Sequence, residues 1–279
     1  MLTGVLYLLG LRTGRPGKPH PGWRSACFYA GLLTIFLALE SPIDGLDGQL
    51  FWVHMVQHLL LIMVAAPLLV LGDPALPILR SSPLGPRRRV LKAVTTQSWT
   101  HRLASVTSRV ASPWPAATIF LLDLYLWHWN LLFNLTLQNY AVHIVEHLCF
   151  LLTAVLLWSQ VIEQRPVHLR LSYLQRAAYV VIVGAAGNLL AMYFVFTPQP
   201  LYSQYVRLSP RPFGMTALMD QQLAGALMWV PVLFVFAIAF SVLLYRWLGE
   251  EEALGSRAQP VAPAYRLLDG SLSTDSRSK

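Results

Sequence analysis

Residues Leu223–Trp247 read LAGALMWVPVLFVFAIAFSVLLYRW, an apolar run of 25 residues in which Arg246 is the one charged side chain. The hydrocarbon core of a bilayer is about 30 Å thick, and roughly 20 mostly apolar residues are needed to cross it as a helix. The run also lacks the alternation of polar and apolar residues that is typical of a transmembrane β-barrel strand. It therefore predicts a transmembrane helix, in which every backbone polar group is satisfied internally.

The rest of the chain carries the same signal. It has 279 residues, of which 55% are hydrophobic and only 12% are charged, whereas soluble domains carry about 25% charged residues. We read the short apolar segment Met1–Leu11 as the tail of a first helix truncated by a late start codon, with a flexible hydrophobic N-terminus as the alternative. The predicted fold is an all-α integral membrane protein, a bundle of six complete transmembrane helices plus a partial or truncated N-terminal helix. Five apolar runs precede the first one quoted: Ser25–Leu39, Leu50–Leu71, Trp114–Phe133, Val142–Ile162 and Ala177–Phe196.

Basic residues indicate how the helices are oriented. Nineteen of the 21 lysines and arginines fall in segments on one side of the predicted membrane, including the loop at 72–113, whereas the loop at 40–49 has three acidic residues and no basic one. Lys and Arg are concentrated in cytoplasmic loops. The sequence thus predicts a multi-pass protein of the bacterial cell (inner) membrane with a cytoplasmic C-terminus. The net charge of +8 follows from this topology, so we expect contact with membrane lipids and no binding of nucleic acid.

The chain is predicted to form one polytopic domain. Residues 1–248 include the transmembrane helices and the basic cytoplasmic loop 72–113, and residues 249–279 form a polar tail that we expect to be disordered. Within the loop, Val90–Val110 places apolar residues at helical spacing. This segment is either a helix along the inner membrane surface or a solvated basic loop.

Two stretches repeat one pattern, because Val53–Leu59 reads VHMVQHL and Val142–Leu148 reads VHIVEHL. Each has two histidines four residues apart, and such residues lie on one face of a helix. Both helices are predicted to begin at the outer surface, which puts both pairs one to two turns below it. The pairs are His54 with His58 and His143 with His147, and the accompanying residues are Gln57 and Glu146.

Other polar and sulfur-containing residues are predicted at the same depth. His128 lies near the outer end of the third complete span, and Asp220 and Gln221 open the last one. Met192 and Met228 lie near the outer ends of the last two spans. We predict a shared metal site with His54, His58, His128, His143 and His147 as ligands, and with Gln57, Glu146, Asp220, Gln221, Met192 and Met228 in possible supporting roles.

Three functions are compatible with this cluster. Imidazole binds copper, iron and zinc, and thioethers favour Cu(I), so handling of copper is the first. Axial histidines on neighbouring helices could instead hold a b-type haem, although two pairs exceed what one haem needs. The third function is zinc proteolysis, because residues 143–147 fit H-x-x-E-H, but the twin motif has Gln57 where a general base would be required. Asp123 lies near mid-membrane on a different face from His128, and we leave it outside the metal site; its position by itself suggests a function.

Several stretches resemble the multi-span CtaG-type assembly factors of bacterial cytochrome c oxidase. The resemblance is carried by Ser41–Asp44, by the first histidine motif followed by Ala66–Pro74, by Trp127-His128, by the second histidine motif, by Leu201–Tyr205 (LYSQY) and by Asp220–Pro231 (DQQLAGALMWVP). It runs in order from about Tyr7 to Trp247. Asn130 departs from the family pattern, in which a proline follows the Trp-His pair.

The resemblance implies a role in respiratory chain biogenesis. A member of this family is expected to mature haem–copper oxidase by supplying copper to its catalytic centre, without turning over a substrate of its own. The implied partners are the cytochrome c oxidase catalytic subunit and an extracytoplasmic copper donor. The five histidines and Asp220 match family positions and inherit this role, with copper as the expected metal and haem as the less favoured cofactor.

Overall fold

The computed structural model describes residues 2–12, 20–41, 43–83, 85, 98–164 and 169–258, which form helices and connecting segments without a strand among them. Five segments are long and apolar enough to cross a membrane, and a bent pair of helices brings the number to six. The predicted all-α membrane fold is confirmed. The five segments are α2 (Gly22–Leu39), Phe51–Leu71, α10 (Tyr140–Trp158), α11 (Tyr173–Phe196) and α13 (Ala217–Ala258).

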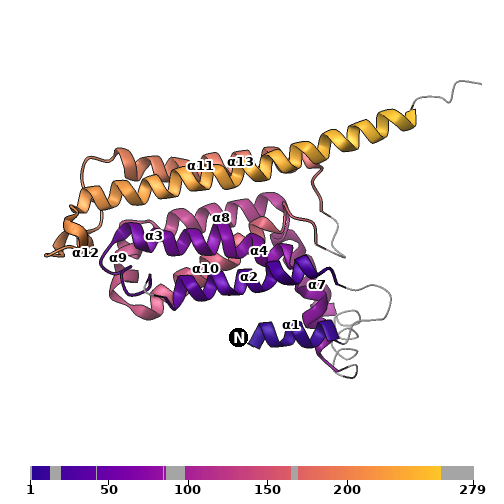
Figure 1. Ribbon diagram of the computed structural model, residues 1–279, viewed down its shortest axis with the longest axis horizontal. Helices are drawn as coiled ribbons and strands as arrows, with labels where there is room; N and C mark the ends of the chain where they lie inside the picture. Colours follow the sequence, from indigo (N-terminus) through magenta and orange to yellow (C-terminus); the bar gives the residue numbers. More distant parts are fainter. Residues whose placement is uncertain are drawn as a thin grey trace, which may run out of the picture.

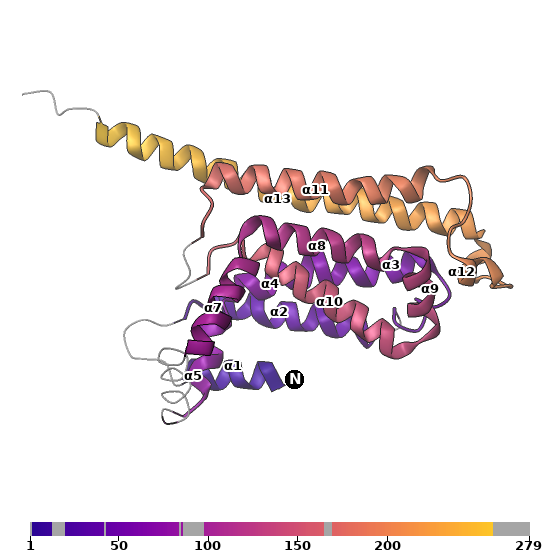
Figure 2. The same cartoon turned by 180° about the vertical axis from the view of Figure 1, so that it is seen from behind.

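The helices are arranged side by side along one direction (Figure 1). Helices α11 and α13 pack against each other along their length, and together they cover α3 (Phe51–Leu59) and α8 (Pro113–Trp127). The view from behind shows α10 and α2 on the other side of α3 and α8 (Figure 2). Small residues permit the close approach of α11 and α13, since a Cβ atom on Gly225 would lie only 2.9 Å from the carbonyl oxygen of Ala191.

The second predicted span, Leu50–Leu71, is one continuous helix with an irregular middle. Helix α3 runs into a π-helical segment, Leu60–Ala65, and then into α4 (Ala66–Leu71). Pro67 has no N–H to donate to the carbonyl four residues earlier, and its ring crowds that carbonyl, so a wider turn precedes it. The indole of Trp158 on α10 donates to the carbonyl of Ile62 at 2.9 Å. The π segment starts just after His58.

The predicted straight span Trp114–Phe133 is wrong in its outer half. Helix α8 ends at Trp127, and α9 (Asn130–Gln138) continues at an angle of 69°. The residues at the break take non-helical conformations, with ψ near 0° at His128 and 134° at Trp129. Residues 134–138, which we expected in a loop, are therefore helical.

The N-terminal segment is a helix packed on the bundle. Helix α1 (Leu2–Arg12) lies against α5 (Ala75–Ser81), and the hydroxyl of Tyr7 donates to the carbonyl of Gly72 at 3.2 Å. A Cβ on Gly10 would overlap the carbonyl oxygen of Pro77, at 1.7 Å, so only glycine permits this contact.

The predicted surface segment and tail are described in part. Helix α7 (Ser98–Val110) occupies the second half of the former, so that part is helical, while residues 86–97 lie outside the described residues. Helix α13 continues to Ala258, and the expected disorder of residues 249–258 is therefore wrong: Glu250, Glu251, Glu252 and Ala253 are good helix formers. Residues 259–279 of the predicted tail lie outside the described residues.

Candidate metal site

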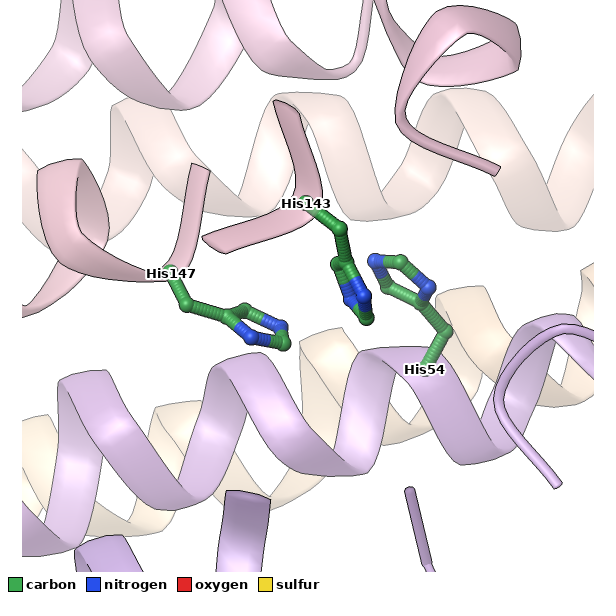
Figure 3. A group of neighbouring side chains, drawn as sticks. All are labelled: His54, His143 and His147. Atoms are coloured by element: carbon green, nitrogen blue, oxygen red, sulfur yellow. The ribbon is translucent and has the colours of Figure 1, made fainter. Parts of the chain in front are cut away.

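The two histidine pairs face each other across the contact of α3 and α10. The imidazole centroids of His54 and His143 are 5.0 Å apart, and those of His58 and His147 are 5.2 Å apart. Figure 3 shows His143 and His147 on one helix pointing toward His54 on the other. The helical spacing of four residues aligns each pair on one face, and the packing of α3 beside α10 turns these faces toward one another.

Two groups of side chains have the dimensions of an ion-binding site. The candidate ligand atoms of His54, His143 and His147 lie within 4.8 Å of one another, and so do those of His54, His58 and Glu146. All five residues are buried. The groups share His54, so the cluster offers two neighbouring positions for a metal ion instead of one.

Many polar atoms in this cluster have no hydrogen-bond partner among the described residues. They include both ring nitrogens of His54 and of His58, Nε2 of His143 and His147, and both carboxylate oxygens of Glu146. Buried polar atoms in native proteins are nearly always satisfied, and an exception calls for an explanation such as an ion or a water. A metal ion bound to the imidazoles would satisfy these atoms, so the donor set fits a metal.

Glu146 crosses to the other helix. Its two carboxylate oxygens lie 3.5 Å from Nε2 of His54 and 3.8 Å from Nε2 of His58. Gln57, its counterpart in the repeat, turns away, and its amide donates to the carbonyl of Ala38 at 3.0 Å and to Asp44 at 3.2 Å. The two motifs therefore have different roles. The motif on α10 places the Glu146 carboxylate inside the cluster, whereas the motif on α3 uses Gln57 to bind the end of α2.

Asp47 is a member of the site that the sequence reasoning missed. Its Oδ2 atom is 3.4 Å from Nε2 of His143 and 4.0 Å from Nδ1 of His54. Burial raises the pKa of the Asp47 carboxyl. The sequence shows three acidic residues in the short loop before α3. Their spacing does not predict which of the three side chains points toward the histidines.

Two tyrosines from the LYSQY stretch hold the segments that carry the site. Tyr205, on α12 (Ser203–Arg207), donates to the backbone carbonyl of Asp47 at 2.6 Å. Tyr202 donates to the backbone carbonyl of His128 at 2.8 Å. Both side chains are buried, so this stretch fixes the acidic loop and the break after α8 together.

Comparison with known proteins identifies the family of this chain. The model of the cytochrome c oxidase caa3 assembly factor family matches residues 5–250. The chain belongs to this family. The family match covers both histidine motifs, the LYSQY stretch and the opening of α13. The CtaG-type resemblance seen in the sequence is confirmed.

The chain is also similar to longer proteins of mycobacteria. An uncharacterized protein of Mycobacterium leprae is 23% identical over 265 residues, and one of Mycobacterium tuberculosis is 24% identical over 263 residues. These alignments cover 92% and 91% of the present chain but only 39% of each relative. The chain thus spans about two fifths of the length of these relatives. No solved structure matches it.

The predicted supporting residues at the start of α13 act on the backbone. The carboxylate of Asp220 accepts from the backbone N–H groups of Phe51 and Trp52, at 3.0 and 2.9 Å, and pairs with Arg211. Gln221 accepts from the N–H of Leu201 at 2.8 Å. The two residues thus position the first turn of α3 and the LYSQY stretch.

The remaining predicted residues are dispersed. His128 lies at the break after α8, with its ring 5.9 Å from that of His58, and it belongs to neither ion-sized group. Met228 and His128 line the same cavity. Met192, on α11, is half-buried and is not among the residues that line this cavity. Asp123 accepts a hydrogen bond from Thr153 of α10 at 2.8 Å.

A cavity leads to the cluster from one side. It has a volume of about 330 Å³ and contacts His143 and His147, and its other lining residues include Glu40 and Asp44. Carboxylates at the mouth of a cavity raise the local concentration of cations. Acidic side chains therefore line the cavity beside the histidines of α10.

Proposed function

We propose that this chain binds copper at the facing histidine pairs and supplies it to the catalytic subunit of a haem–copper cytochrome c oxidase. The observation that carries the proposal is the pair of ion-sized groups that share His54 among otherwise unsatisfied buried nitrogens. Imidazole suits copper, and family membership supports a task in oxidase assembly. The role is delivery, without turnover of a substrate.

Copper explains the cluster better than haem. A haem iron needs one imidazole on each side of the macrocycle, whereas the His54 and His143 rings lie only 5.0 Å apart, centre to centre. Zinc proteolysis is also less well supported. A general base would have to serve the ion held by His143 and His147, but Glu146 is directed at His54 and His58.

The proposed setting is the bacterial cell membrane, with the histidine end of the bundle toward the outer side. An extracytoplasmic copper donor would then reach the acidic cavity beside His143, and the oxidase catalytic subunit would receive the ion within the membrane. The distribution of basic residues supports this orientation.

The test is metal analysis and visible spectroscopy on the purified full chain. We expect bound copper without a Soret band, loss of that copper in the double variant His54→Ala/His58→Ala, and loss of the ion held by His54, His143 and His147 in His143→Ala/His147→Ala. His20→Ala is the matched control, since His20 lies at the opposite end of the bundle, where it contacts Tyr7. In cells, both double variants should fail to support oxidase assembly.

Two results would contradict the proposal. A strong Soret band that disappears with His58 or His147 would indicate a membrane cytochrome. Full oxidase assembly with both histidine pairs replaced would show that the cluster has no part in the function.

A further inference from the structure

A second cavity, with a volume of about 40 Å³, lies deeper in the bundle than the paired histidines. It is enclosed by side chains from α3, the π segment, α8, α11 and α13. Its apolar walls include Phe120, Val183 and Val232. The polar and sulfur-containing side chains that line it are Met55, Met63, Met228, His58 and His128, and no carboxylate is among its lining residues.

The orientation of His128 is informative. Its Nδ1 atom is 2.7 Å from the carbonyl oxygen of Leu124, which can only accept, so Nδ1 carries the proton. In the neutral ring, Nε2 then has a free lone pair. That atom is 3.4 Å from the sulfur of Met55, which has no proton to donate. Nε2 of His128 and the sulfur of Met55 therefore face each other as two electron-pair donors in the interior of the bundle. A soft cation bound by both atoms would stabilise this arrangement.

His58 connects this cavity to the histidine cluster. Its ring contacts those of His54 and His147 on one side, at 4.4 and 5.2 Å between centroids, and that of His128 on the other, at 5.9 Å. The side chain is 3% exposed, and neither ring nitrogen has a hydrogen-bond partner among the described residues. His58 is thus an unpartnered ligand that lies between the two places.

We propose that this cavity, which we name the thioether chamber, is a second metal site selective for Cu(I). Met55 and His128 are the principal ligands, His58 is shared with the histidine cluster, and Met228 and Met63 are within the same cavity. Thioethers favour Cu(I), and imidazole can join them as a neutral ligand, whereas the carboxylates of Glu146 and Asp47 in the histidine cluster are ligands that suit divalent ions. The inference rests on the proposed function, to which it adds the oxidation state and a second position for the ion.

The experiment uses the purified full chain with Cu(I) under anaerobic conditions, and Ag(I) as a redox-inert probe of the same softness. Bound metal is counted by elemental analysis after dialysis, and X-ray absorption at the copper edge reports whether sulfur is a neighbour. We expect sulfur to be detected in the wild type. Met55→Leu should remove the sulfur signal and about one equivalent of Cu(I) and Ag(I), while Zn²⁺ binding at the histidine cluster persists.

Matched variants separate the two sites. Met192→Leu is the control, because it makes the same exchange outside the chamber and should leave the sulfur signal unchanged. Met228→Leu is a second chamber variant, for the event that Met55→Leu does not fold; Leu and Met exchange with little change in volume. His143→Ala/His147→Ala should lose the metal held by the His54, His143 and His147 group and retain Ag(I) in the chamber.

The outcomes are distinguishable. If the wild type binds copper with nitrogen neighbours alone, or if sulfur persists in both chamber variants, the chamber is packing and the proposed function stands. If Zn²⁺ and Cu(I) both fail to bind, both proposals are wrong. If Ag(I) is retained by the chamber but no metal binds the cluster, the chamber is a metal site and the proposed copper cluster is wrong.

Discussion

At the scale of single residues, His54 has an unusual position. It is completely buried and is the one histidine that both ion-sized groups have in common. His147, by contrast, belongs to one group and borders the acidic cavity. Replacement of His54 should therefore reduce metal binding more than replacement of His147.

We expect His54→Gln to abolish metal binding in both groups, because each is left with two ligands. His147→Gln should remove one group and leave His54, His58 and Glu146 in place. Elemental analysis of the purified variants, loaded with Zn²⁺ or Cu(I), would give the number of ions bound. Equal losses in the two variants would argue against a shared ligand.

A histidine at the other end of the bundle predicts a pH effect on stability. Burial lowers the pKa of His20 below its ordinary value of 6.5, and its Nε2 atom lies 2.7 Å from the hydroxyl of Tyr7. The unfolded chain binds the proton at higher pH than the folded one, so stability falls as the pH drops below 6.5 and is regained above it. Thermal unfolding at pH 7.5 and 5.5 should show this loss, and a shallower pH dependence in His20→Gln. An unchanged slope would exclude His20 as the cause.

At the scale of elements, the start of α3 depends on α13. Asp220 accepts two backbone hydrogen bonds from the first turn of α3 and also pairs with Arg211, whose side chain is 9% exposed. Leu201 is tied to the same helix through Gln221. The turn that carries His54 is thus held by α13, and 169 positions separate Phe51 from Asp220 in the chain.

We expect Asp220→Ala to destabilise the protein by about 3–5 kcal/mol, because it leaves the buried guanidinium of Arg211 without its carboxylate and two N–H groups without a partner. The decrease should be measured as free energy of unfolding, together with weaker metal binding. Glu163→Gln is the control: Glu163 pairs with Arg176 at 3.1 Å but is 49% exposed, and such pairs contribute at most about 1 kcal/mol. A loss of similar size in both variants would contradict the anchoring role.

At the scale of the whole molecule, all parts of the site gather at one end of the bundle. Helices α9 and α12 and the start of α3 lie there, while α5 and α7 lie at the opposite end (Figure 2). The described basic side chains Arg80, Arg102 and Arg109 belong to α5 and α7. By the positive-inside rule, these basic residues support the proposed placement of the histidine end on the outer side.

Reporter fusions test this orientation. Green fluorescent protein fused after Gly255 should fluoresce, because the end of α13 is predicted to be cytoplasmic. Alkaline phosphatase inserted at Ser209, beyond α12, should be active, because it requires export. The reverse pattern would place the histidine cluster on the cytoplasmic side and exclude an external copper donor.

The sequence by itself determined the number and approximate limits of the spans, and it determined which histidines share a face. These properties depend on hydrophobic length and on helical periodicity, which are local. It also predicted that Val53–Leu59 and Val142–Leu148 would meet, because both stand at the same ends of their helices. The sequence resemblance also predicted the family, and the family match confirms it.

Only the tertiary structure decided how the polar groups are distributed among neighbours. The relative rotation of α3 and α10 places the Glu146 side chain in the histidine cluster and directs the Gln57 side chain toward Ala38. The path of a loop brings Asp47 to His143, and the break after Trp127 turns His128 toward Met55. Periodicity within one helix cannot predict such contacts, because they depend on packing between segments that are distant in the chain. For this reason one predicted site became a shared pair of histidine groups with a separate thioether chamber behind it.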